Sequence, residues 1–368
     1  MPTALFVWRR YTPPFLIGGA EVSQRLLAEE FAGAGWNVTY LGSYEAPWNG
    51  ASDLTAMCRQ LATWNVRYSY DHVRDELRYQ WNGVDCRAVP QVGLFPALEA
   101  LLTAGPIELV VTSQEGSAVL AKRAASVAPV AGWVHSVSRT GVEVLRGRPQ
   151  YALATSRFVA SRLDVPDGTT AVLFYPPFAA LGGEPPAAED RTDDLLMVNP
   201  VPAKGARLVT ELARRLPECR FTLVEGWWDT SGHFTGLANV RWVRRTYEMG
   251  GLYRSHRLLL VPSVVEDAFP RVIIEAGLAG LPTIGSARGG IIEAIEDGGP
   301  VIAGGNVERW ISVIRSLDGP AWTEYARRAR ERASRLVRSC LAELAVAGVI
   351  GTTGLSCRTN AARSGARS

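Results

Sequence analysis

The sequence predicts an α/β protein built from two Rossmann-like, doubly wound domains that face each other across a cleft. The chain opens with a strand, a loop, a helix and a second strand, the first unit of a parallel sheet. A second α/β series begins near residue 195. Residues 178–194, between the two series, are rich in proline, glycine and acidic residues, as expected of an interdomain linker. A length of 368 residues also favours two domains.

The first domain is predicted over residues 1–177. The expected elements are strands at 4–8, 36–42, 107–113, 130–136, 151–156 and 170–177 and helices at 20–34, 93–104, 116–127 and 156–163. Residues 77–89 alternate apolar and polar side chains around Asn82-Gly83, the strongest short signal for a β-hairpin. An edge hairpin is therefore expected within this domain.

The second domain is predicted over residues 195–320. Its expected strands lie at 195–200, 221–226, 240–245, 258–263 and 282–286, with helices between them. A closing helix over 321–338 and a partly disordered tail over 339–368, disordered from about residue 355, complete the chain. Ligands of doubly wound sheets bind beyond the carboxyl ends of the strands, so the cleft between the two domains is the expected binding site.

The composition argues against several classes of protein. A formal net charge of +3 predicts no large basic face, so nucleic acid is not an expected partner. Five scattered cysteines without a CxxC pair favour neither a disulfide framework nor a zinc site. The first apolar run lacks a preceding basic segment, so it is read as a strand rather than a signal peptide. No 18-residue apolar stretch is free of charge. A cytoplasmic protein is the expectation.

Gly18 and Gly19 stand where the loop after the first strand enters the first helix. Two glycines allow a ligand to approach the backbone, and the free N–H groups of a helix start attract phosphate. A Gly-Gly turn that binds nothing explains the same pattern, and these residues alone do not decide between the two.

Lys204 occupies the matching place in the second half, directly after the strand at 195–200. Only Lys122 and Lys204 are lysine among 39 basic residues, a bias typical of a GC-rich, bacterial coding genome. Because arginine is the usual cation of this chain, a lysine in a motif carries more information. At the cleft-facing end of a strand it can neutralise a diphosphate. The alternative is a solvated surface lysine.

Glu275 interrupts an otherwise apolar helix within the segment PSVVEDAFPRVIIEAGLAGLPTIGS. One carboxylate can accept hydrogen bonds from both hydroxyls of a ribose, and the alternative is a helix-start residue satisfied by backbone groups. Asp267 lies eight residues earlier, in the loop that leads into this helix. Gly289 and Gly290 begin a further helix and offer more free N–H groups.

This segment resembles the E-x7-E signature of glycosyltransferase family 4, the retaining enzymes with the GT-B fold. The second half matches in order through LLMVNPVPAKG, LLLVPS, EDAFPRVIIEAGLAGLPTI and GGIIEAIEDGG. The first half matches through GGAE, the strand ending at His135, SRFVASRL and VLFYPP. The resemblance covers residues 4 to about 338 and implies the GT-B fold and a nucleotide-sugar donor.

By this resemblance Glu275 would bind the ribose hydroxyls and Lys204 the diphosphate. Asp267 stands at the first glutamate of the pair, which meets the donor sugar, and His135 matches a histidine near the reacting face of that sugar. A strand-end histidine with a satisfied hydrogen bond is the alternative for His135. The implied catalytic residues are His135, Lys204 and Asp267, and the implied donor-binding residues are Gly18, Gly19, Asn199, Lys204, Phe269, Arg271, Val272, Glu275, Gly289 and Gly290.

Three positions depart from the family pattern. Asp267 is one methylene shorter than glutamate, and Asn199 stands where the family usually has the arginine that partners the lysine. Pro270 replaces the usual glycine after Phe269 and removes an N–H that could have faced the donor. Contact with the donor sugar is the feature that these departures affect most.

No Asp-x-Asp motif is present, so neither a metal ion nor another cofactor is expected. Lys204 and the N–H groups at helix starts would then meet the charge on the departing nucleotide diphosphate. The resemblance implies hexosyl transfer with retention of configuration, in which the departing phosphate oxygen takes the acceptor proton. UDP-sugars are the favoured donors, with GDP- and dTDP-sugars open. The acceptor is an unidentified hydroxyl compound: a natural product, a glycan or a lipid-linked sugar.

Two other functions stay open. A nucleotide-sugar epimerase uses the same two-domain fold and needs no acceptor, and a non-catalytic nucleotide-sugar-binding protein would agree with the three departures. Contact with a membrane surface is open but not indicated, because no basic amphipathic helix stands out in the first domain. Loops at 43–75 and 136–150 would shape the acceptor pocket.

Overall fold

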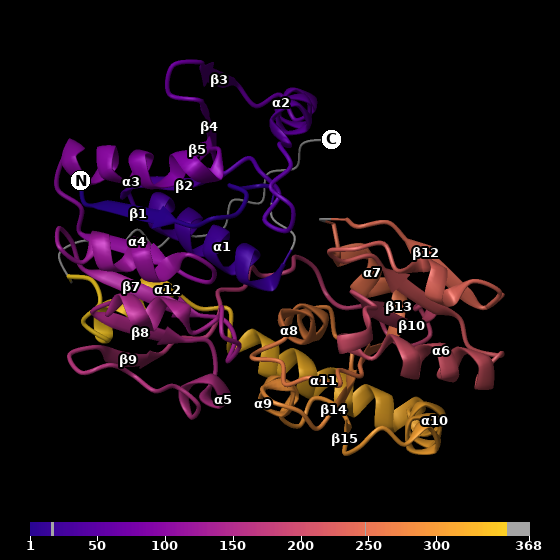
Figure 1. Cartoon of the computed structure of the whole chain (residues 1–368). Helices are drawn as coiled ribbons and strands as arrows, with labels where there is room; N and C mark the ends of the chain where they lie inside the picture. Colours follow the sequence, from indigo (N-terminus) through magenta and orange to yellow (C-terminus); the bar gives the residue numbers. More distant parts are fainter. Residues whose placement is uncertain (16–17, 247, 352–368) are drawn as a thin grey trace.

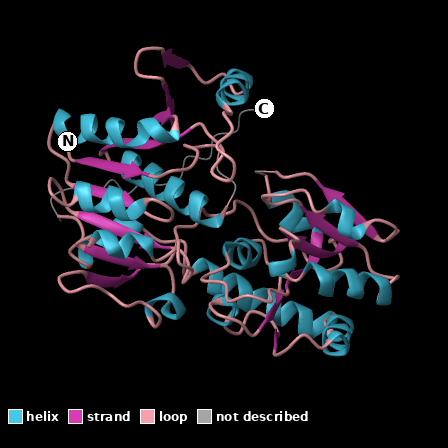
Figure 2. Cartoon of the chain, viewed as in Figure 1, coloured by secondary structure: helices cyan, strands magenta, loops and turns pink. Residues whose placement is uncertain are grey.

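The computed structural model describes residues 1–15, 18–246 and 248–351 of the chain. Figure 1 shows two α/β units, each with its own sheet, and Figure 2 shows helices packed around both sheets. The fold class expected from the sequence is confirmed, because both units are wound around predominantly parallel sheets.

The first sheet contains nine strands within the described ranges, in the order β3-β4-β5-β2-β1-β6-β7-β8-β9. Their bounds are β1 Thr3–Val7, β2 Asn37–Ser43, β3 Tyr68–Asp71, β4 Glu76–Trp81, β5 Val84–Val89, β6 Leu109–Thr112, β7 Val130–Val134, β8 Tyr151–Ala154 and β9 Thr170–Leu173. Neighbouring strands are parallel except at β4, which is antiparallel to β3 and β5. The expected hairpin is confirmed: Asn82 and Gly83 join β4 to β5 with φ values of 46° and 83°.

The helices of the first unit are α1 Gly19–Gly33, α2 Leu54–Thr63, α3 Leu94–Ala104, α4 Ser117–Ala124 and α5 Arg157–Ala160. The expectation of a loop over residues 43–75 is wrong, because this segment contains α2 and β3. Met57 and Leu61 lie one turn apart on α2 and are both buried. They give the helix an apolar side that packs on the first unit.

Successive residues of β1 face two different cores. Ala4 and Phe6 pack in the core that contains α1, whereas Leu5 and Val7 pack in the core that contains α3 and α4. Both faces of the strand are therefore covered, which explains why its sequence is a continuous apolar run.

The second sheet is parallel throughout, in the order β12-β11-β10-β13-β14-β15. Its strands are β10 Asp193–Val198, β11 Phe221–Val224, β12 Val240–Val243, β13 His256–Val261, β14 Thr283–Ser286 and β15 Val301–Ile302. Its helices are α6 Ala206–Arg215, α7 Gly250–Ser255, α8 Arg271–Leu278, α9 Ile291–Ile295, α10 Val307–Ser316 and α11 Gly319–Ser334. Leu195 and Met197 of β10 pack with α6 and α10, and Leu196 packs on the other face with α8 and α9.

After α11 the chain returns to the first unit and forms α12 (Cys340–Val346). Leu341 and Leu344 are buried in the same core as Phe31 of α1, and Figure 1 shows this helix against the first sheet. The sequence placed these residues in a tail and did not predict the helix. The disorder expected from about residue 355 lies outside the described residues.

Glu293 of α9 ties the second unit to the first. Its carboxylate accepts hydrogen bonds from the amides of Arg157 and Phe158, at 2.9 and 3.1 Å, at the start of α5. The Tyr175 hydroxyl donates to the same carboxylate at 2.5 Å. A single acidic side chain therefore satisfies two helix-start amides and a phenol of the other unit.

The packing of α12 predicts a contrast between two neighbouring positions. Leu344→Ala should lower the free energy of unfolding by about 2–5 kcal/mol, because it empties a fully buried site in the first-unit core. Val346 is 92% exposed on the same helix, so Val346→Ala should stay within about 0.5 kcal/mol of the wild type. Urea denaturation measures both. Equally small effects would mean that α12 does not belong to that core.

Candidate active site

A cavity of about 1010 Å³ lies between the two units. The start of α1 and the end of β7 line one side of it, and the segments that follow β10, β11, β12 and β13 line the other. Carboxyl ends of parallel strands meet at this edge, where ligands of doubly wound sheets bind. The volume is at the upper end of the range of about 300–1,000 Å³ for small-molecule sites.

Most of the residues singled out by the sequence line this cavity: Gly18, Gly19, His135, Asn199, Lys204, Asp267, Phe269, Arg271, Val272 and Glu275. Gly289 and Gly290 are not in the lining. The Gly290 N–H donates to the Asp267 carbonyl at 2.6 Å, and a Cβ on Gly290 would lie 1.8 Å from the Ala268 oxygen. The expectation of a free amide is therefore wrong for Gly290, which instead holds the loop that carries Asp267.

Lys204 ends the short 3-10 turn η3 (Pro202–Lys204) that precedes α6. Its Nζ forms an ion pair with the Asp267 carboxylate, and Ser263 Oγ donates to the other oxygen of that carboxylate at 2.5 Å. The lysine side chain is 33% exposed and the aspartate side chain 12%. A diphosphate at this position would compete with Asp267 for the lysine charge.

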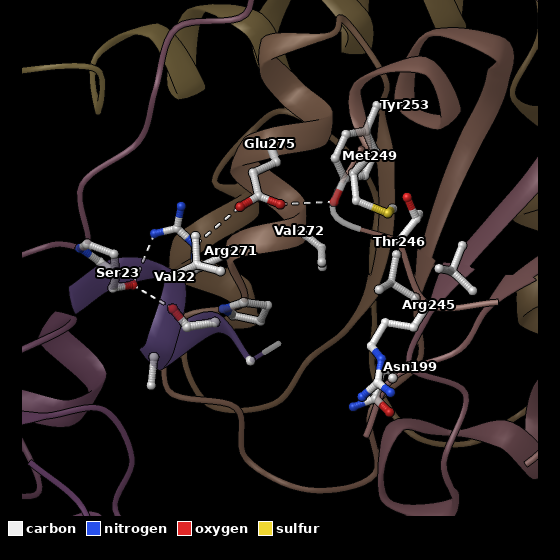
Figure 3. A pocket seen from close by; sticks show the side chains of 18 of the residues that line it. Val22, Ser23, Asn199, Arg245, Thr246, Met249, Tyr253, Arg271, Val272 and Glu275 are labelled. Carbon is white, nitrogen blue, oxygen red and sulfur yellow. Dashed lines mark hydrogen bonds and ion pairs between the residues drawn. The ribbon is translucent and has the colours of Figure 1, made fainter. Parts of the chain in front are cut away.

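Glu275 lies on α8 and is held by two neighbours, as Figure 3 shows. Arg271 Nε donates to one carboxylate oxygen at 3.1 Å, and the Tyr253 hydroxyl donates to the other at 3.0 Å. Burial, together with the Glu275 charge, raises the pKa of Tyr253 well above its usual value, so the phenol remains a donor. The Glu275 side chain is 28% exposed, which leaves acceptor capacity for ligand hydroxyls.

Arg271 and Phe269 form part of the cavity wall through contacts with other protein groups. The Arg271 guanidinium donates to Ser23 Oγ at 3.0 Å and to the Pro177 carbonyl at 2.7 Å, in addition to its bond to the α8 carboxylate. The rings of Phe269 and Tyr175 lie 5.2 Å apart. The two residues thus help to join the units around the cavity.

His135 follows β7 and packs on Trp133, with ring centroids 4.5 Å apart. Its Nε2 is buried and has no hydrogen-bond partner among the described residues, so the alternative of a satisfied histidine does not hold for this atom. Burial, followed by the charges of Arg271 and Arg10, lowers the pKa of His135 to about 3. The imidazole is therefore neutral at neutral pH and offers a hydrogen bond without a charge.

Gly18 directly precedes α1, and Gly19 is its first residue. A Cβ on Gly18 would lie 2.2 Å from Glu21 Oε2. Glu21 is itself buried and forms an ion pair with Arg10, a pair that the sequence analysis missed. A larger residue at position 18 would therefore have to displace the Glu21 carboxylate, whether or not a ligand binds.

Asn199 follows β10 in the left-handed region, with φ 57°. Its Oδ1 is buried without a hydrogen-bond partner in the described part of the chain. Residues other than glycine rarely adopt this conformation, and such strain concentrates at functional sites. Asn199 lines the cavity, and its Oδ1 lies against Gly226, where a Cβ would be 2.1 Å from that oxygen.

A further wall of the cavity, which the sequence did not predict, is formed by the segments after β11 and β12. Its lining residues include Trp227, Arg245, Thr246, Met249 and Tyr253. Figure 3 shows Arg245, Thr246 and Met249 on the side opposite Ser23. Their positions in the sequence could have identified them as lining residues, because Trp227 and Arg245 follow strand ends just as Asn199 does.

Within residues 1–15, 18–246 and 248–351, no group of three or more histidine, cysteine, aspartate or glutamate side chains is arranged to hold a metal ion. None of the described helices has the length and apolar character needed to cross a membrane.

The lowered pKa of His135 predicts that acid destabilises the fold. The unfolded chain protonates this histidine near pH 6.5 and the folded chain only near pH 3, so stability is lost as the pH falls from 6.5 towards 3. Between pH 7 and pH 5, His135→Gln should lose about 2 kcal/mol less stability than the wild type, measured by urea denaturation.

The matched control for this measurement is His233→Gln, at an exposed position in a short turn of the second unit. Its stability should follow the wild-type dependence on pH. If His135→Gln also follows the wild type, His135 is not the buried neutral group described above.

Residues 197–317 match the family model described as Glycosyl transferases group 1. No curated protein matches the chain. Similar solved structures include sucrose-phosphate synthase from Thermosynechococcus elongatus, with a TM-score of 0.72, 17% identity and coverage of 95% of this chain and 98% of that one. For Anabaena HepE in complex with UDP-glucose the TM-score is 0.70, the identity 15% and the coverage 94% and 98%.

The pneumococcal O-GlcNAc transferase GtfA, in complex with UDP and GlcNAc, has a TM-score of 0.65 and 11% identity, with coverage of 95% of this chain and 98% of that one. At these identities the structural likenesses establish the fold alone. The chain therefore has the GT-B fold, and its second domain matches the group 1 glycosyl transferases.

Proposed function

We propose that the protein is a metal-independent, retaining glycosyltransferase of family 4 that moves a hexosyl-type sugar from a nucleotide-sugar donor to a hydroxyl acceptor. The observation that carries the proposal is that Lys204 and Glu275 line one interdomain cavity, within the segment that matches the group 1 glycosyl transferases. A nucleoside diphosphate sugar needs a cation for its diphosphate and benefits from a carboxylate for its ribose diol. Retention rests on the E-x7-E-like spacing of Asp267 and Glu275.

In the proposed complex the ribose hydroxyls donate to Glu275, which Tyr253 and Arg271 hold in place. The diphosphate takes the place of Asp267 beside Lys204. The released Asp267 carboxylate then accepts hydrogen bonds from hydroxyls of the donor sugar, which compensates the carboxylate for the loss of its ion pair.

The sugar's anomeric carbon is transferred between two oxygens. Its bond to the diphosphate oxygen breaks, a bond to the acceptor hydroxyl oxygen forms on the same face, and the acceptor proton passes to the departing phosphate. Lys204 stabilises the negative charge that builds on the leaving diphosphate. The neutral His135 offers a hydrogen bond to the sugar. No protein general base is assigned.

UDP-sugars are the first donors to test, since Anabaena HepE has been solved with UDP-glucose and pneumococcal GtfA with UDP and GlcNAc. The acceptor is a hydroxyl compound: a natural product, a glycan or a lipid-linked sugar. The four described cysteines form no disulfide, which agrees with action in the reducing cytoplasm.

A thermal-shift screen against UDP, GDP, dTDP and their common sugars, without metal, should find one stabilising nucleotide, with UDP the favoured one. At 100 times its dissociation constant a ligand stabilises the folded state by about 2.7 kcal/mol. Glu275→Ala should weaken binding and so reduce the shift at the same nucleotide concentration, because the ribose loses its acceptor. Glu308→Ala should retain it, because that side chain is 66% exposed on α10 and does not line the cavity.

No shift with any nucleotide would contradict the proposal. Binding without turnover across a broad acceptor panel would favour the non-catalytic alternative, and isomerisation of the donor in the absence of an acceptor would favour an epimerase.

Lys204→Ala should lower turnover by about 100-fold or more, because one preorganised cation no longer meets the leaving diphosphate. Lys122→Ala, at the other lysine of the chain, is the matched control: this residue is exposed on α4 and should not affect turnover. Initial rates at saturating donor measure both. The double variant Lys204→Ala, Asp267→Asn should be at least as slow as Lys204→Ala. Recovery in the double variant would attribute the loss to an unpaired aspartate rather than to the missing lysine.

A further inference from the structure

Arg271 joins three parts of the molecule that are far apart in the sequence. Its Nε donates to Glu275 on α8 at 3.1 Å, and its Nη1 donates to Ser23 Oγ on α1 and to the Pro177 carbonyl, at 3.0 and 2.7 Å. The guanidinium carbon lies 4.4 Å from the ring centroid of Phe178. Only 6% of the residue is exposed, and Figure 3 shows it between α8 and Ser23.

The planar guanidinium fixes the relative positions of its acceptors. Its N–H groups point in set directions, so Ser23, Pro177 and Glu275 are bonded together only in one arrangement of α1, the segment just before the linker and α8. Separation of the two units would remove Ser23 and break its hydrogen bond with the charged guanidinium, a bond that favours the closed arrangement. Arg271, Ser23, Pro177 and Glu275 together form what we call the Arg271 joint.

Ser23 connects the joint to the first-unit side of the cavity. Its hydroxyl donates to the Gly19 carbonyl at 2.6 Å and accepts from Arg271. Gly19 lines the cavity at the start of α1, and a Cβ there would lie 3.2 Å from Arg271 Cδ. A chain of three hydrogen bonds therefore runs from the first turn of α1 to the Glu275 carboxylate.

We propose that Arg271 is a positioning residue that couples binding at Glu275 to the closed arrangement of the two units, and that it does not itself contact the donor. The identity of the ligand, a nucleoside diphosphate sugar, rests on the proposed function. This role differs from the donor-binding role that the family resemblance implied, because protein acceptors and an aromatic ring already surround the guanidinium. When closed units are the binding-competent state, the apparent dissociation constant rises as the closed population falls.

A double-mutant cycle between Ser23 and Glu275 tests the coupling, with UDP binding to the full chain measured by isothermal titration calorimetry. Ser23→Ala removes the first-unit acceptor and should weaken UDP binding about tenfold, as loss of a hydrogen bond to a charged group does. In a Glu275→Ala background the same change should have an effect below about threefold, because the joint has lost its second-unit end. Equal effects in the two backgrounds would overturn the proposal.

Ser161→Ala is the matched control for the cycle. Ser161 is an exposed serine of the first unit whose hydroxyl donates to the Phe158 carbonyl. This variant should bind UDP as the wild type does. If it weakens UDP binding as much as Ser23→Ala, the effect is not specific to the joint and the proposal fails.

Small-angle X-ray scattering provides a readout that needs no nucleotide. Ser23→Ala and Arg271→Lys should both have a larger radius of gyration than the wild type, since a lysine cannot bridge three acceptors in one plane. Ser23→Ala removes a single hydroxyl and keeps the test valid if Arg271→Lys does not fold. If the variants fold and keep the wild-type radius of gyration, the proposed role of the Arg271 joint in closure is wrong. Absence of UDP binding together with the expected scattering would overturn the proposed function and leave closure by Arg271 supported.

Discussion

The parallel register of β10 with its two neighbours is the constraint on which the second-unit side of the cavity depends. Leu196 lies opposite Thr222 of β11 and Leu259 of β13, so the three strands end at the same edge of the sheet. Neighbouring strands are about 4.8 Å apart, and the loops that follow them therefore start close together. This is why Lys204 and Asp267, which are 63 positions apart in the sequence, form an ion pair.

Three ion pairs lie in or beside the wall of the cavity. Lys204 pairs with Asp267, Arg271 with Glu275, and Arg10, at the border of the cavity, with Glu21. Removal of one partner from a buried pair leaves an uncompensated charge, which costs free energy. Replacement of that partner by another group of the same charge avoids this cost. In the proposed complex a diphosphate would replace one anion beside Lys204 with another. In this way Lys204 would keep an anionic partner when a charged ligand binds.

The chain crosses between the units twice, once through the linker and once after α11, and the second crossing ends in the core of the first unit. The buried Leu344 of α12 and the Glu293 contact with α5 hold the units together at separate places. The Arg271 joint adds a third contact, at the cavity itself. Relative motion of the units is thus restricted to changes that α12 and Glu293 can follow, as in hinge closure of a two-domain protein.

The sequence by itself determined the α/β order, the hairpin at Asn82-Gly83 and the positions of Lys204 and Glu275 relative to strand ends. These features depend on apolar periodicity and turn chemistry within short windows, which a single sequence displays directly. It also indicated the edge of each sheet at which a ligand would bind, because that edge follows from parallel topology.

Only the tertiary structure decided which side chains become partners. It paired Lys204 with Asp267, bonded Arg271 to Ser23 across 248 positions of sequence, and used the Gly290 amide within the protein. It also placed α12 in the first-unit core. Local propensity carries no information about such contacts, because they arise where distant segments pack together and their polar groups must find partners away from water.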